Sequence, residues 1–127
     1  MSADLSVTRT WPWGLALVVD PGSNDDLPTS MDGANVVALS SGLVCAVRHE
    51  VEGAATVTVR VDSVLPDDLV LDFAGSVVLL TGELAISDIE RTECRTIAVA
   101  PGPYRAVVIT DEPNEPTSVQ IWLQHIG

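Results

Sequence analysis

The residue types that catalysis requires are scarce in this sequence. Nucleophilic catalysis needs a base beside a serine or cysteine, and the chain has two histidines, His49 next to Glu50 and His125 near the end. It contains no G-x-S-x-G turn, no phosphate-binding glycine loop and no lysine for Schiff-base chemistry. We therefore predict that the protein is not an enzyme and that it uses no cofactor.

An acidic segment contains oxygen ligands of the kind that calcium accepts. Five candidates lie close together in the chain: Asp20, Asn24, Asp25, Asp26 and Asp32. Their spacing does not match the EF-hand loop, which needs alternating ligands, a central glycine and a bidentate glutamate. Aspartate and asparagine beside proline and glycine are typical of turns. We therefore predict a solvated loop over residues 21–33 and no metal site.

The net charge restricts the possible partners. There are 18 acidic residues against 6 basic ones, all arginine, which gives a formal net charge of -12. Phosphate backbones and anionic membrane surfaces repel such a chain, so we predict neither nucleic acid nor membrane as a partner. The excess of acid suits either simple solubility or attraction to a basic protein. A basic protein is therefore the partner that the composition allows.

The cysteines and the N-terminus bear on location. Two cysteines, Cys45 and Cys94, are too few for a disulfide framework. Residues 1–4 have neither the basic nor the apolar region of a secretory signal, and no window approaches the ~18 apolar residues of a membrane helix. We expect a cytoplasmic protein in which both cysteines are free thiols.

Alternation of apolar and polar side chains predicts β-strands along most of the chain. In residues 56–62, Val57, Val59 and Val61 fall on one face and polar side chains on the other. We predict one all-β domain over residues 1–127, an antiparallel β-sandwich of Greek-key or jelly-roll type with about eight to ten short strands. The candidate segments for these strands are residues 5–10, 15–19, 35–39, 43–49, 56–62, 68–73, 77–80, 84–87, 96–99, 104–109 and 118–124.

Signals for helices are weak, and turn signals are frequent. Ser87 and Glu90 have capping-box spacing, so residues 87–91 are the best helix candidate, with at most two turns. Glycine and proline predict turns at residues 66–68, 74–75 and 101–103. A longer acidic connection, residues 111–116, looks like the tip of the hairpin that joins the last two strands.

Two groups of side chains are candidates for contact with a partner. The hairpin tip carries three acidic residues, Asp111, Glu112 and Glu115, and we expect it to project from the edge of the sandwich. The second group lies on the last predicted strand, where alternation places Gln120, Trp122 and Gln124 opposite the core.

Trp122 has two interpretations. An exposed tryptophan between glutamines suits a protein interface or a sugar-binding platform, because indole is favoured in binding hot spots. Alternatively, Trp122 covers the edge of the core or packs under the loop of residues 21–33. Both interpretations are compatible with the strand pattern.

The last fifty residues or so have a distinctive order of features. After Val77 come residues 97–107, the acidic loop 111–116 and residues 119–123. A Gly-x-Tyr turn, Gly102-Pro103-Tyr104, opens the penultimate strand, and a polar–aromatic strand closes this part of the chain. This order resembles that of a group of small bacterial β-sandwich proteins similar to the competence-associated nuclease inhibitor. The resemblance implies a jelly-roll-like sandwich that inhibits a toxin or nuclease by binding it.

The favoured function is a non-enzymatic, acidic protein-binding module of the immunity or nuclease-inhibitor type. A nuclease is basic where it holds DNA, so an acidic protein can be steered to that surface and compete for it. Two alternatives stay open. One is a small-ligand or carbohydrate-binding sandwich that uses Trp11, Trp13 and Trp122. The other is a structural subunit of an assembly, a homo-oligomer included, whose two-sided apolar strands bury one face against another chain.

Overall fold

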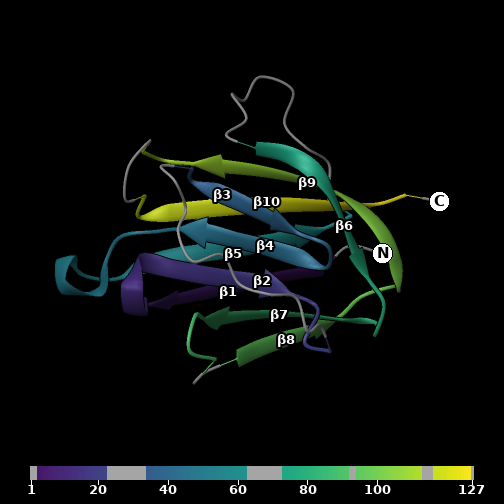
Figure 1. The fold of residues 1–127 in the computed structure, drawn as a ribbon, viewed down its shortest axis with the longest axis horizontal. Helices are drawn as coiled ribbons and strands as arrows, with labels where there is room; N and C mark the ends of the chain where they lie inside the picture. Colours follow the sequence, from purple (N-terminus) through teal and green to yellow (C-terminus); the bar gives the residue numbers. More distant parts are fainter. Residues whose placement is uncertain (1–2, 23–33, 63–72, 92–93, 113–115, 127) are drawn as a thin grey trace.

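The computed structural model describes residues 3–22, 34–62, 73–91, 94–112 and 116–126. In this part of the chain, ten strands form two five-stranded sheets packed face to face (Figure 1). The first sheet has the order β1 (Ala3–Arg9), β5 (Ala55–Val61), β10 (Ser118–His125), β9 (Gly102–Thr110) and β6 (Phe73–Leu79). The second has the order β3 (Val36–Leu39), β4 (Gly42–Ala46), β2 (Leu15–Val19), β7 (Glu83–Asp88) and β8 (Cys94–Ala98).

Two short 3-10 turns, η1 (Pro12–Gly14) and η2 (Glu50–Glu52), complete the described elements. All strand pairs are antiparallel except β5 with β10, which run parallel at the centre of the first sheet. The predicted all-β sandwich is therefore confirmed. No helix in the described ranges has the length and apolar character needed to cross a membrane.

The core lies between the sheets and follows the predicted alternation. In β5 the odd-numbered valines, Val57, Val59 and Val61, are buried, while the side chains between them are partly exposed on the outer face. Buried residues of both sheets belong to one hydrophobic cluster. Burial of these apolar side chains is the main force that holds the two sheets together.

The strand β2 is buried on both faces, as its uninterrupted apolar sequence suggests. Ala16 and Val18 face the other sheet, whereas Leu17 and Val19 form a second cluster with Val44 on the opposite face. These four residues of β2 and Val44 are all buried within the chain itself. The structural-subunit alternative requires an exposed apolar sheet face that another chain can cover. The residues of β2 do not provide such a face, because both of its faces are already buried.

Two local predictions are wrong. Residues 87–91 do not form a helix, because β7 extends to Asp88 and pairs with β2 there, and the Ser87 hydroxyl donates to the Asp88 carbonyl oxygen at 3.0 Å. Residues 74–75 are not a turn but lie within β6, where Gly75 leaves room for the Phe73 ring. A Cβ at Gly75 would lie 2.7 Å from Cζ of Phe73, so the glycine serves packing and not a turn.

Some strand limits also differ, and some predictions fall outside the described residues. The fourth strand ends at Ala46 and not at residue 49, and β8 begins at Cys94, two residues before the predicted strand at 96–99. Cys45 and Cys94 are both free thiols, and burial raises the pKa of Cys45 to about 12. The turn at 66–68, most of the strand at 68–73 and most of the loop at 21–33 lie outside the described ranges.

Candidate protein-binding surface

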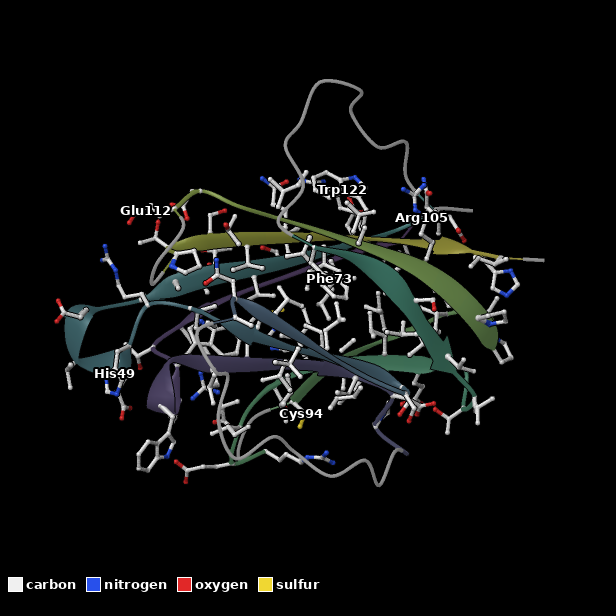
Figure 2. The ribbon with its side chains drawn as sticks, turned by 45° about the horizontal axis from the view of Figure 1, so that its top comes forward. His49, Phe73, Cys94, Arg105, Glu112 and Trp122 are labelled. Carbon is white, nitrogen blue, oxygen red and sulfur yellow. The ribbon has the colours of Figure 1, made fainter. Side chains whose placement is uncertain are left out.

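Three connections meet at one end of the sandwich. The Val47 amide donates to the Gly14 carbonyl oxygen at 2.9 Å, which joins η1 to the segment before η2. The Arg48 amide donates to the Pro116 carbonyl oxygen at 2.9 Å, which brings in the connection between β9 and β10. Figure 2 shows His49 and Glu112 at this same end. We call this surface the acidic end and define it by its exposed residues: Trp13, Glu50, Val51, Glu52, Asp111 and Glu112.

Trp13 is the largest exposed side chain of the acidic end. It is 71% exposed, and its backbone lies in the left-handed region, with φ 62 and ψ 7. A bulky residue is rarely found there, because the conformation costs about 1–2 kcal/mol. Gly14 continues the left-handed turn at φ 64 and approaches the Val47 carbonyl oxygen so closely that a Cβ would lie 3.0 Å from it. The tight turn therefore directs the indole of Trp13 into solvent.

The turn η2 presents a second apolar side chain. Val51 is 80% exposed and lies between Glu50 and Glu52, which are also exposed. His49 holds the turn, because its Nδ1 accepts from the Val51 amide at 3.3 Å and its carbonyl oxygen accepts from the Glu52 amide at 2.9 Å. His49 therefore acts as a cap in this structure. An exposed valine between two glutamates is a surface that a partner with apolar and basic groups can cover.

The predicted site residues of the hairpin tip, residues 111–116, differ in the contacts that their carboxylates make. The Asp111 carboxylate accepts from the amides of Thr117 and Ser118, each at 3.0 Å, and from the Thr117 hydroxyl. Burial acts to raise the pKa of Asp111, but these hydrogen bonds outweigh it and hold the pKa below its ordinary value. Asp111 therefore shapes the hairpin, whereas the exposed carboxylate of Glu112 has no hydrogen bond or ion pair within the described ranges. Glu115 lies outside them.

The predicted face of β10 exists, but its tryptophan is buried. Val119, Ile121 and Leu123 belong to the core cluster, which confirms the partition of the strand into two faces. Trp122 lies on the opposite face and is only 5% exposed. The interpretation in which Trp122 is exposed is therefore wrong. Gln120 and Gln124, on the same face, are half-buried.

Neighbouring strands supply two contacts of Trp122. Arg60 of β5 is its partner in register, and the guanidinium carbon lies 5.7 Å from the centre of the indole ring, within cation–π range. Val107 of β9 is its partner on the other side and is also buried. Arg60 in turn lies 3.4 Å from the Asp4 carboxylate. Trp122 is thus part of the packed structure and not a free platform.

No family model matches the chain, and no curated protein matches it by sequence. Among solved structures it is similar to ComJ from Bacillus subtilis, an inhibitor of the DNA-degrading activity of NucA, with a TM-score of 0.75 and 12% identity over 99% of each chain. The fold is similar to that of ComJ. A crocagin biosynthesis protein, gene J, is similar with a TM-score of 0.63 and 16% identity, over 100% of this chain and 98% of that one.

The similarity to ComJ confirms the resemblance drawn from the last fifty residues and extends it to the whole fold. At 12% identity it concerns the fold alone. The surface residues of this chain must therefore be interpreted from their own chemistry. The acidic end differs from the predicted protein-binding site, because it contains four residues that the sequence pattern does not indicate for that role: Trp13, Glu50, Val51 and Glu52.

The candidate calcium segment has a different role at its one described member. The Asp20 carboxylate accepts from the amides of Gly22, Leu80 and Thr81 at 2.9, 2.7 and 3.0 Å, and from the Thr81 hydroxyl at 2.6 Å. Burial acts to raise its pKa, but the hydrogen bonds outweigh it and lower the pKa below 3.8. Asp20 thus ties the end of β2 to the turn before β7. The other four candidates lie outside the described residues, and within those residues no group of three acidic, histidine or cysteine side chains is arranged to hold a metal ion.

We expect Asp20→Asn to lower the free energy of unfolding by about 2 kcal/mol at pH 7, because hydrogen bonds to a buried charge are among the stronger ones. The folded-state pKa lies below the unfolded value of 3.8, so the carboxylate stabilises fully above pH 3.8 and this contribution is lost as the pH falls through the folded pKa. Urea unfolding of both proteins should show a gap that closes in acid. Asp4→Asn, at an exposed ion pair, should change stability by less than about 1 kcal/mol. Equal stability of Asp20→Asn and the parent at pH 7 would contradict this role.

Proposed function

We propose that this chain is a non-enzymatic inhibitor-like module that binds a basic protein through its acidic end. The observation that carries the proposal is the exposure of Trp13 and Val51 among carboxylates that point into solvent. Tryptophan is enriched in binding hot spots, and surrounding charges steer a partner and exclude wrong ones. The indole and Val51 would supply apolar contact, while Glu50, Glu52 and Glu112 would attract the basic surface.

The similarity of the fold to that of ComJ supports this proposal. ComJ, which has a similar fold, is an inhibitor of a DNA-degrading protein. A protein that binds DNA must be basic at that site, and a chain of net charge -12 is suited to meet such a surface. We therefore propose a nuclease or a toxin with a basic binding surface as the class of partner.

The carbohydrate-binding alternative loses two of its three aromatic residues. Trp11 and Trp122 are buried, and Trp11 uses its indole nitrogen to donate to the Ala55 carbonyl oxygen at 2.9 Å. Trp13 alone is exposed, without a second aromatic platform in the described part of the chain. The protein-binding function is therefore the one that the geometry favours.

Charge reversal at the acidic end tests the proposal. A partner recovered from the native host on the immobilised protein should bind Glu52→Arg/Glu112→Arg with an association rate constant about tenfold lower at low salt, because steering depends on exposed charges. Asp111 is left unchanged, since its carboxylate supports the hairpin. The difference should shrink in ~0.5 M salt, where the Debye length falls below about 5 Å.

The matched control reverses two carboxylates elsewhere, Asp4→Arg/Glu83→Arg, and therefore changes the net charge equally. Glu83 begins β7 and Asp4 lies near the start of β1, away from η1 and η2. The control should retain most of the association rate, as measured by surface plasmon resonance. Equal slowing by both pairs would mean that the net charge, and not the acidic end, governs association.

A further inference from the structure

An open cavity of about 550 Å³ lies along one side of the sandwich, between β1 and β8. These strands are the edges of the first and second sheets, and within the described ranges neither pairs with a further strand on this side. Together with β7 they run along the lower side of the molecule in Figure 1. The volume is in the range of small-molecule binding sites. The cavity does not involve the residues of the acidic end.

Two arginines occupy inward positions at this cavity. Arg9 follows Leu5 and Val7 on the face of β1 that is directed to the core, and Arg95 pairs in register with the buried Ile86 of β7. Both line the cavity. The whole chain has only six basic residues against 18 acidic ones, so two arginines at one cavity are a local concentration of positive charge.

The guanidinium of Arg9 is held in place before any ligand arrives. Its Nη1 lies 3.1 Å from the fully buried carboxylate of Asp88, and its Nε donates to the Thr10 carbonyl oxygen at 2.9 Å. The guanidinium carbon also lies 5.5 Å from the centre of the Trp11 ring. A group fixed in this way loses little conformational freedom when it binds a ligand.

Asp88 neutralises the charge of Arg9 but not that of Arg95. The side chain of Arg95 is exposed and makes no ion pair or hydrogen bond in the described part of the chain. No carboxylate is among the described residues that line the cavity. Val7 is half-buried there, whereas Trp11 and Ile86 are fully buried behind the cavity surface. The cavity therefore presents one uncompensated positive charge, that of Arg95, on a lining that is mostly polar.

We propose that this cavity binds a small organic oxyanion, which is either a carboxylate or a phosphate. The oxyanion binds between Arg9 and Arg95, and the rest of the molecule lies along the edge strands β1 and β8. Guanidinium groups suit this role because their donors match the geometry of carboxylate and phosphate oxygens. This binding is separate from the capture of a basic protein, so either can fail without the other.

The test is an NMR titration of the isotope-labelled protein with benzoate and with phenyl phosphate. The indole N–H of Trp11 and the side-chain Nε–H of Arg95 should shift saturably, with a Kd of about 1 mM for a fragment of this size. Neutral benzamide has the same ring and should leave these signals unchanged. Comparison of the two anions shows which oxyanion the site prefers.

Two variants of equal charge make the test specific. Arg95→Gln should weaken binding at least about tenfold, since it removes a hydrogen bond to a charged group. Arg105→Gln removes an exposed arginine from the outer face of β9 and should leave the Kd unchanged. Both side chains are exposed, so both proteins should fold, and unchanged dispersion in the NMR spectrum checks this. The proposal is overturned if neither anion shifts the signals, if benzamide shifts them equally, or if the two variants lose affinity alike.

Discussion

Replacing Trp122 by alanine is expected to lower the free energy of unfolding by about 3–5 kcal/mol, the range for buried tryptophan truncation. The indole is 5% exposed and lies in register between Arg60 and Val107, so its loss leaves a cavity on the outer face of the first sheet. Arg60 would also lose the aromatic face over which it lies. Urea unfolding followed by circular dichroism measures the change.

The neighbouring glutamine gives the comparison for Trp122. Gln120→Ala alters a half-buried residue on the same strand face and should cost less than about 1 kcal/mol. Trp122→Phe should fall between the two, because it keeps an aromatic ring and removes less volume. A loss below about 1 kcal/mol for Trp122→Ala would show that the indole is not part of the packed structure.

Trp13→Gly is expected to weaken the complex with the partner without lowering the stability of the fold, in contrast to Trp122→Ala. The left-handed backbone at Trp13 costs a non-glycine residue about 1–2 kcal/mol, and glycine avoids this while losing about 0.5–1 kcal/mol through unfolded-state entropy. With the indole 71% exposed, little packing is lost. The free energy of unfolding should therefore stay equal or rise by up to about 1 kcal/mol.

Binding should respond to the same change in the other direction. Loss of a tryptophan hot spot costs about 2 kcal/mol or more, which raises Kd about thirtyfold, mainly through faster dissociation. Trp13→Ala retains the left-handed conformation and should lose the same affinity without the gain in stability. The role of Trp13 would be contradicted by a complex of unchanged Kd, or by a fold weakened by more than about 2 kcal/mol.

The sequence predicts the two faces of individual strands well, because alternation is a local property. Val57, Val59 and Val61 are buried as expected, and so are Val119, Ile121 and Leu123. A face that is opposite to the core is not always exposed, however. Trp122 is such a case, and no local pattern tells whether that face is covered.

The acidic end shows the other limit of prediction from sequence. Trp11 and Trp13 are separated by one residue, yet Trp11 is fully buried and Trp13 is exposed, because the backbone turns through a left-handed conformation between β1 and β2. Trp-Pro-Trp-Gly offered a signal for this turn, since proline fixes φ and glycine accepts positive φ. The roles of His49 and Asp111 depend on hydrogen bonds to backbone groups, and for Asp111 these are made six and seven residues away.

The position of β10 has a consequence for synthesis on the ribosome. This strand, Ser118–His125, lies between β5 and β9 at the centre of the first sheet, although it comes last among the described strands. Until these residues leave the exit tunnel, β5 and β9 lack the strand that joins them, and both present unpaired edges. The first sheet therefore closes only after residues 118–125 have been translated. Nascent chains stalled before residue 118 would expose apolar faces and depend on chaperones to stay soluble.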